Sequence, residues 1–229
     1  MTDKHPRLFD LPAAPARHPA RYSAELQPVL VEALRGCHRL LDPFGGVGGV
    51  FALEPFLPGC QIDAIEIEPE WAAQNSRITQ GNALALPWPA ATFDAICTSP
   101  CYGNRMADHH EARDASKRNT YRHALGRPLH PDNAGALQWG DAYRAFHLRA
   151  WCEALRVLRP GGRFVLNVKD HIRGGALQPV SAWHVETLAT LGMRQVWRKE
   201  IECPGQRCGA NGHLRMSTEN VILFVTDHR

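Results

Sequence analysis

Short apolar segments alternate along the chain with longer segments whose apolar residues recur at helical intervals. The short segments predict β-strands in "HRLLD", "CQIDAIEIE", "FDAICT" and "GGRFVLNV". Helices are expected from Ala24 to Gly36, from Pro69 onward and over "DAYRAFHLRAWCEALRV". A glycine-rich turn and an apolar helix are expected after the first strand. This alternation predicts an α/β fold in which helices cover both faces of a parallel sheet.

The C-terminal part of the chain departs from this alternation. A helix near "SAWHVETLATLG" is followed by two strands in succession, "RQVWRKEIE" and "ENVILFVTD". Consecutive strands joined by a polar, glycine-containing loop are typical of a hairpin. We therefore expect a mostly parallel sheet that is closed by an antiparallel C-terminal hairpin.

The composition fits one globular domain. The chain has 229 residues, 44% of them hydrophobic, and a net charge of +3, which permits a nucleic-acid partner without requiring one. The N-terminus has no apolar targeting segment, and no apolar run approaches the roughly 18 residues that span a bilayer, so we expect a soluble, cytoplasmic protein. Seven cysteines without a repeated CxxC spacing favour free thiols over disulfides or structural zinc.

Two segments lie outside the strand and helix pattern. Residues 1–20 are rich in Pro and Ala and are expected to form an extended arm. Residues 103–140 are polar and rich in Arg and His, and a loop of that length in a compact domain is usually functional or disordered. We therefore expect a single domain over residues 1–229 with a substrate-binding insertion.

The turn "LLDPFGGVGG" is the first candidate for a binding site. Its strand ends at Asp42, and the glycines that follow allow a ligand to approach the backbone closely. A tight strand-to-helix turn would explain the glycines equally well. The next strand, however, ends in Glu66, about twenty residues on, where doubly wound folds place the carboxylate that binds a ribose diol. The two features together favour a nucleoside cofactor.

The stretch "TSPCYGNR" directly follows the third strand and admits three interpretations. It is a turn that ends a strand, a pocket that grips a flat substrate, or the site of a cysteine nucleophile. "DPFGGVGG" resembles the DPFxGxG motif of class I S-adenosylmethionine-dependent methyltransferases that alkylate amino groups of nucleic-acid bases. "TSPCY" resembles the (D/N/S)PPY motif of the same family. "HPARYSAEL", "AIEIEPEWA", "QGNALALPWPAATFDAICTSP" and "LRVLRPGGRFVLNV" follow in the family's order, so the resemblance spans most of residues 18–227.

The resemblance implies a Rossmann-like, seven-stranded fold and S-adenosyl-L-methionine as cofactor. By position, it places residues of the N-terminal motif and the glycine turn at the methionine end of the cofactor. These residues are Tyr22, Ser23, Asp42, Phe44, Gly45 and Gly48. It also places Glu66 on the ribose and Asn82 at the adenine amine, where family members often have Asp.

The resemblance implies a role for each residue of the turn after the third strand. An exocyclic base amine is a poor nucleophile because its lone pair is delocalised into the ring. In the family mechanism Ser99 and the carbonyl of Pro100 accept the two amine protons, while Tyr102 stacks on an extruded base. Catalysis is then mainly positioning and desolvation, without a metal. Serine at the first position favours cytosine N4 over adenine N6.

Cys101 departs from the family pattern, which usually has a second proline there. Cytosine-C5 methyltransferases place their attacking thiolate after a proline on the corresponding strand end, so Cys101 is also a candidate nucleophile. That chemistry needs a carboxyl group from an ENV motif. "ENV" occurs at Glu219 to Val221, but on the last strand rather than on the one after "RPGG". The neighbouring Arg105 would lower a thiol pKa. Because "ENV" lies on a different strand from the one that C5 enzymes use, we read Cys101 mainly as a small turn residue and keep the nucleophile as the alternative.

Restriction-type DNA methyltransferases usually carry a separate target-recognition domain, and this chain has little room for one. The expected substrate-binding residues lie in the insertion, in the loop between the last two strands and at the end of the fourth strand. They are Arg105, Arg118, Tyr121, Arg122, Arg207, Asp170 and His171. A solvated loop explains the basic residues as well, and a helix cap explains Asp170. The sequence "DHH" lacks a third metal ligand at fixed spacing.

These observations predict S-adenosylmethionine-dependent methylation of an exocyclic amine of a DNA base. Cytosine N4 is favoured and adenine N6 is next. The alternatives are a C5 enzyme that uses Cys101, an RNA-base methyltransferase, and a cofactor-binding regulatory module without catalysis.

Overall fold

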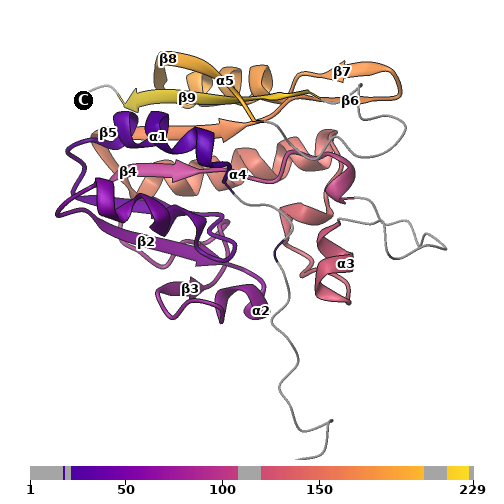
Figure 1. Ribbon diagram of the computed structural model, residues 1–229, viewed down its shortest axis with the longest axis horizontal. Helices are drawn as coiled ribbons and strands as arrows, with labels where there is room; N and C mark the ends of the chain where they lie inside the picture. Colours follow the sequence, from indigo (N-terminus) through magenta and orange to yellow (C-terminus); the bar gives the residue numbers. More distant parts are fainter. Residues whose placement is uncertain (1–17, 19–21, 108–119, 204–215, 227–229) are drawn as a thin grey trace, which may run out of the picture.

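The computed structural model describes residue 18 and residues 22–107, 120–203 and 216–226. Seven strands form one sheet in the order β3-β2-β1-β4-β5-β9-β8 (Figure 1). Their bounds are Ile78–Gln80 for β3, Gln61–Glu66 for β2, Arg39–Asp42 for β1, Phe93–Thr98 for β4, Leu158–Val168 for β5, Thr218–Thr226 for β9 and Met193–Glu202 for β8. Strands β1 to β5 are parallel, whereas β9 is antiparallel to both β5 and β8. The predicted fold class and C-terminal hairpin are confirmed.

Two layers of helices cover the sheet. One layer contains η2 (Ala24–Leu26), α1 (Gln27–Leu34) and the 3-10 helix η3 (Gly49–Phe56). The other contains α4 (Asp141–Val157) and α5 (Val180–Thr190). Successive strand residues enter opposite cores: Leu40 packs with the first layer and Leu41 with the second. This alternation follows from the period of two in a strand and explains why the central strands are apolar throughout.

Several elements differ from the sequence expectation. The apolar helix after the glycine turn is a 3-10 helix that contains Pro55, a residue unsuited to an α-helix interior. The helix that opens at Pro69 ends after one turn, as α2 (Pro69–Ala72). The short strands β3, β6 (His171–Arg173) and β7 (Ala176–Gln178) were not expected. Within the described residues, no helix is both long enough and apolar enough to cross a membrane.

Parts of the insertion that the structure describes are folded. They contain η4 (Arg105–Ala107), α3 (Tyr121–Leu125) and η6 (Ala134–Ala136). Helix α3 lies beyond the ends toward which the arrows of β4 and β5 point (Figure 1). The insertion therefore lies on the side of the sheet where the parallel strands end.

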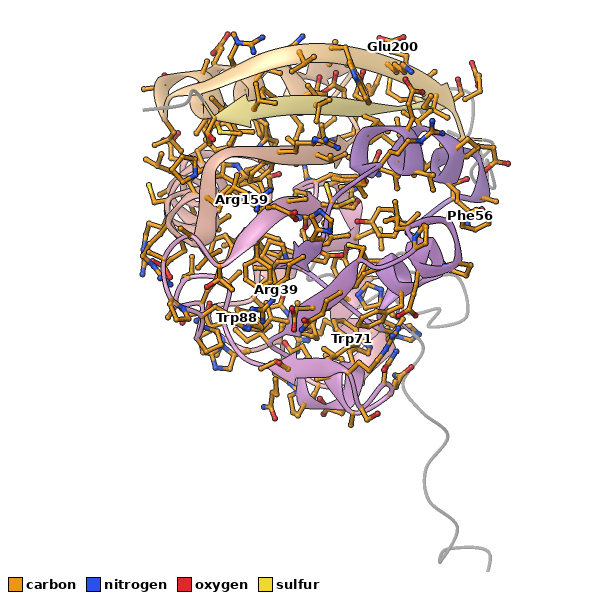
Figure 2. The ribbon with its side chains drawn as sticks, turned by 90° about the vertical axis from the view of Figure 1, so that its left-hand side faces the viewer. Arg39, Phe56, Trp71, Trp88, Arg159 and Glu200 are labelled. Atoms are coloured by element: carbon orange, nitrogen blue, oxygen red, sulfur yellow. The ribbon has the colours of Figure 1, made fainter. Side chains whose placement is uncertain are left out.

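The opposite ends of the strands are tied together by Asp94, the second residue of β4. Its buried carboxylate accepts the backbone amides of His38 and Arg39 at 2.7 and 2.9 Å and lies 3.4 Å from the Arg159 guanidinium. Figure 2 looks onto this side of the molecule, where Arg39 and Arg159 are labelled. The amino ends of β1, β4 and β5 are therefore fixed by structural contacts, and the carboxyl ends are left for a site.

Trp151 should be one of the residues on which the fold depends most. It is fully buried on α4, and its Nε1 donates to His184 Nδ1 at 3.0 Å. We expect Trp151→Ala to lower the free energy of unfolding by about 3–5 kcal/mol, because it leaves a large cavity and an unpaired histidine nitrogen. Leu148→Ala on the same helix is the control: Leu148 is 43% exposed, and its loss should change stability by about 0.5 kcal/mol or less. Urea unfolding measures both, and equal effects would contradict this assignment.

Candidate active site

The carboxyl ends of neighbouring parallel strands bring the predicted site residues to one edge of the sheet. Asp42 ends β1, Glu66 ends β2, and Ser99 follows β4 directly. In open α/β sheets this edge is where ligands bind. The structure therefore places the residues expected at the cofactor and the residue expected at the amine at one edge of the sheet.

Asp42 connects three separate parts of the chain. Its carboxylate accepts the Thr98 hydroxyl at 2.7 Å and the Phe44 amide at 3.0 Å, and the Tyr22 hydroxyl lies 3.5 Å from its second oxygen. Burial raises the pKa of Asp42 to about 6, and the hydrogen bonds from Thr98, Phe44 and Tyr22 act in the opposite direction. Asp42 therefore anchors the glycine turn rather than standing free toward a ligand.

Glu66 lies under the same turn. Its two carboxylate oxygens accept the amides of Gly46 and Glu68, at 3.0 and 2.9 Å. Burial raises the pKa of Glu66 to about 7, the amide hydrogen bonds lower it, and the neighbouring Glu68 raises it. A carboxyl group buried at the end of β2, with backbone amides on one side, suits a ligand that brings its own hydroxyl donors.

Gly45 shows why the turn needs glycine. A Cβ at this position would lie 2.9 Å from the Cβ of Ala64, because the Gly45 amide bonds to the Ile65 carbonyl at 2.9 Å. The turn is thus packed directly on β2, with its backbone beside Glu66. This arrangement fits a nucleoside-containing cofactor that spans the ends of β1 and β2.

Both polar groups of the Asn82 side chain, which was expected at the adenine amine, already form hydrogen bonds within the chain. Its side-chain oxygen accepts the Leu84 amide at 2.8 Å, and its NH₂ donates to Asp132 at 2.9 Å. Asp132 belongs to the insertion and is exposed. An acidic side chain of the insertion therefore lies beside Asn82. Ser23, expected at the methionine end, bonds instead to Glu25 at the start of η2.

The turn after β4 is joined to β5 and β9 by a cluster of polar side chains. Ser99 Oγ and Tyr102 Oη lie 2.7 Å apart, and Tyr102 Oη lies 3.3 Å from Glu219 Oε2. The Asn167 amide donates to Glu219 at 2.7 Å and lies 3.1 Å from the Tyr102 hydroxyl and 3.3 Å from the Ser99 hydroxyl. Pro100 is buried, and Ser99 is half-buried. The predicted catalytic residues are thus held by Asn167 and Glu219, to which the sequence analysis gave no role in amine methylation.

Cys101 has a different environment. Burial raises the pKa of its thiol to about 12, and its side chain interacts with Tyr121 and Glu66. A nucleophilic cysteine requires a depressed pKa. The side chain of Arg105, which would have lowered it, lies outside the described residues. These features favour the interpretation of Cys101 as a turn residue.

A chain of buried hydrogen bonds from α4 and α5 reaches the backbone of the turn after β4. Because the Trp151 indole can only donate, His184 Nδ1 accepts, and burial keeps the pKa of His184 well below its ordinary value. The neutral ring therefore carries its proton on Nε2, 2.9 Å from Tyr143 Oη, and Tyr143 donates to the Cys101 carbonyl at 2.8 Å. Gly103, at φ 64°, then turns the chain away.

Glu68 fixes the described part of the insertion to the sheet. It is fully buried and accepts Arg127, the His130 amide and the Asn133 side chain, each at 2.7 Å. Arg127 also pairs with Glu70. The insertion is therefore clamped across the end of β2.

The candidate substrate-binding residues have different environments. Tyr121 is buried against His18 and Trp71, and its role in substrate binding stays a prediction. Arg122 is exposed. Arg118 and Arg207 lie outside the described residues, as does the side chain of Arg105.

Asp170 and His171 follow β5, as expected, but only the Asp170 side chain forms hydrogen bonds with described residues. Asp170 accepts the amide and the hydroxyl of Ser181 at 2.7 and 2.8 Å and so satisfies a first-turn amide of α5. Both ring nitrogens of His171 are buried, and no described residue forms a hydrogen bond with them. Burial lowers the pKa of His171, and Arg173 lowers it further. The N-cap residue of α5 is Pro179, so Asp170 is not the N-cap residue that the alternative interpretation expected, although it bonds to the first turn of α5 from outside the helix. His171 remains a candidate for ligand contact.

Several residues of this site were not among the site residues that the sequence predicted. Thr98 stood inside the quoted motif, and Glu219 stood inside the quoted "ENV", so signals for both existed. Asn167 stood inside the quoted "LRVLRPGGRFVLNV", near the end of a predicted strand, so a signal existed for it too. Tyr143 carried no signal, because apart from the fold nothing relates it to the turn after β4.

No protein-family model matches the sequence, and no curated protein matches it. Solved structures do share the fold. A SAM-dependent methyltransferase from Methanosarcina mazei has a TM-score of 0.57 at 12% identity, covering 88% of this chain and 98% of that one. The [4+2]-cyclase SpnF has a TM-score of 0.55 at 15% identity, covering 89% and 81%.

A third structure is a 1,6-didemethyltoxoflavin-N1-methyltransferase from Burkholderia thailandensis with bound S-adenosylhomocysteine. Its TM-score is 0.50 at 19% identity, with 90% of this chain and 79% of that chain covered. At these identities the likeness establishes the Rossmann-like class I methyltransferase fold. One of the three is a cyclase by name, so the activity of this chain has to be argued from its own residues.

The raised pKa of Glu66 predicts a pH dependence of stability. The unfolded carboxyl ionises near 4.5 and the folded one near 7, so the folded state binds the extra proton between these values. The stabilisation is fully present below pH 4.5 and is lost as the pH rises through 7, about 3 kcal/mol in all. Glu66→Gln should lack this component. Denaturant unfolding of both proteins from pH 4.5 to 7.5 measures the difference, and parallel curves would contradict the assignment.

Proposed function

We propose that this chain transfers a methyl group from S-adenosylmethionine to an exocyclic amine of a DNA base, with cytosine N4 as the preferred acceptor. The observation that carries the proposal is the position of Ser99. Its hydroxyl stands at the carboxyl end of β4, hydrogen-bonded to Tyr102, at the same sheet edge as the glycine turn over Glu66. This places an acceptor for an amine proton near a nucleoside-binding edge.

The methyl donor fits the residues at the ends of β1 and β2. Glu66 would bind the ribose hydroxyls, and the Asn82–Asp132 pair offers an acidic edge to the adenine amine. The turn over residues 44–48 would hold the methionine part, with Tyr22 beside Asp42. S-adenosylmethionine supplies an electrophilic methyl group. Structural neighbours that are named as SAM-dependent or that contain S-adenosylhomocysteine support this choice.

The residues after β4 would position the amine. Ser99 accepts one amine proton, which draws the lone pair out of the base ring, and the Pro100 carbonyl accepts the other. Tyr102 limits the base to one plane. Asp42 accepts a hydrogen bond from Thr98. The turn after β4, which would hold the base, and the glycine turn after β1, which would hold the cofactor, are therefore kept at a fixed separation. Such positioning supplies several kcal/mol of the barrier reduction in two-substrate enzymes.

A nucleic acid fits the surroundings of this edge. The exposed Arg122 of α3 lies on the insertion, which Glu68 holds across the end of β2. A flipped base enters such a site from a duplex or a single strand, and basic residues around the mouth bind its phosphates. DNA is the proposed partner, and RNA is the alternative that the same assay tests.

Two single substitutions test the chemistry. Ser99→Ala should lower the rate of methyl transfer by about 100-fold or more, because the amine loses its proton acceptor. Cys101→Ala should stay within a few-fold of wild type, because a thiol with a pKa of about 12 is protonated at neutral pH. The rate is measured as radiolabelled methyl incorporation into DNA and into RNA, and mass spectrometry of the nucleosides identifies the product.

The product distinguishes the proposal from its rivals. N4-methylcytosine or N6-methyladenine supports amine methylation. Loss of activity in Cys101→Ala together with 5-methylcytosine would assign the C5 reaction instead. Cofactor binding without transfer to any nucleic acid would favour a regulatory role.

A further inference from the structure

Glu219 lies beside the turn after β4, although it comes 117 positions after Tyr102 in the sequence. Strand β9 runs antiparallel to β5, and Val168 near the end of β5 pairs with Asn220 near the start of β9. The first residues of β9 are therefore at the edge where the parallel strands end. This places the Glu219 carboxylate 3.3 Å from Tyr102 Oη and 2.7 Å from the Asn167 amide.

The carboxylate determines the direction of the hydroxyl protons beside it. An ionised carboxylate only accepts hydrogen bonds, so the Tyr102 hydroxyl donates to Glu219. Tyr102 Oη then accepts from the Ser99 hydroxyl, 2.7 Å away. Both protons thus point toward Glu219, and Ser99 Oγ keeps a lone pair for a donor from outside the chain. The carboxylate is therefore the reason that Ser99 faces a substrate as an acceptor.

We propose that Glu219 is the terminal proton acceptor of the reaction, reached through the hydroxyls of Ser99 and Tyr102. This inference rests on the proposed amine methylation. The amine nitrogen forms a bond to the methyl carbon while the carbon–sulfur bond breaks, and sulfur keeps the electron pair. The amine gives one proton to Ser99 Oγ. The Ser99 hydroxyl proton moves to Tyr102, and the Tyr102 proton moves to Glu219.

The relay leaves both hydroxyls unchanged and the carboxylate protonated. A serine hydroxyl is too weak a base to hold the proton by itself, whereas a carboxylate can. Glu219 is only half-buried, so water can remove the proton before the next turnover. Asn167, which is 1% exposed, donates to the carboxylate and lies within 3.3 Å of both hydroxyls, and it acts as the positioning residue of the relay.

Glu219→Gln separates proton transfer from shape. The glutamine oxygen can still accept from Tyr102 and Asn167, but it does not bind a proton at neutral pH. We expect the single-turnover rate of methyl transfer to fall by about 100-fold or more. The dissociation constant of S-adenosylmethionine and the melting temperature should stay at wild-type values. The matched control is Glu200→Gln on β8, an exposed position labelled in Figure 2, which should keep the wild-type rate.

Tyr102→Phe interrupts the same relay in the middle and keeps the aromatic ring. It should slow the reaction about as much as Glu219→Gln, and the double variant should be no slower than the slower single variant, because both act in one chain. The wild-type rate should also fall in D₂O, and both variants should lose that isotope effect. A wild-type rate in Glu219→Gln, or losses that multiply in the double variant, would overturn the relay.

The relay and the proposed substrate can be judged separately. All rates are measured on the acceptor that the wild-type protein methylates. An acceptor other than DNA would refute the DNA proposal, and the ratio of variant to wild-type rate would still support or overturn the relay. A wild-type protein that methylates no amine would overturn both.

Discussion

The hydrogen bond from Thr98 to Asp42 is the contact on which the site depends. It is 2.7 Å long, buried, and joins the last residue of β4 to the last residue of β1. β1 leads into the glycine turn and β4 leads into the turn with Ser99, so one bond fixes the separation of the two halves of the site. The strands themselves are adjacent, with Leu40 opposite Ala95 and Leu41 opposite Ile96. A short polar bond at the end of a rigid pair of strands gives a more exact geometry than contacts between loops would.

The same edge carries a cost in stability. Asp42 and Glu66 are both buried, and burial raises the pKa of each. Glu68, next to them, is buried as well and requires three donors from the insertion to satisfy it. Burial of a carboxylate costs desolvation energy that its hydrogen bonds must offset, and groups whose pKa is shifted by burial cluster at functional sites. The concentration of buried acids at the ends of β1 and β2 is therefore itself an argument that a polar ligand binds there.

The sequence was a good guide where a local pattern determines the structure. The apolar strands, the helix over α4 and the ends at Asp42 and Glu66 follow from periodicity and turn chemistry, and the structure confirms them. The burial of Tyr121 could not be predicted, because an aromatic residue in a polar segment gives no indication whether its ring is buried. Glu219 was recognised in "ENV" but could not be placed, because the register of β9 against β5 depends on tertiary pairing, which no local pattern encodes.

The antiparallel direction of β9 decides what the site contains. A parallel strand in this position would bring its last residues to the carboxyl edge, which in β9 lie near Thr226. Because β9 runs the other way, its first residues are there, and Glu219 meets Tyr102 and Asn167. Serine in the turn after β4 is neutral and cannot by itself carry a proton away, whereas an aspartate in its place could. The antiparallel direction of β9 thus brings the Glu219 carboxylate to the site, where the Ser99 and Tyr102 hydroxyls lie between it and the proposed position of the amine.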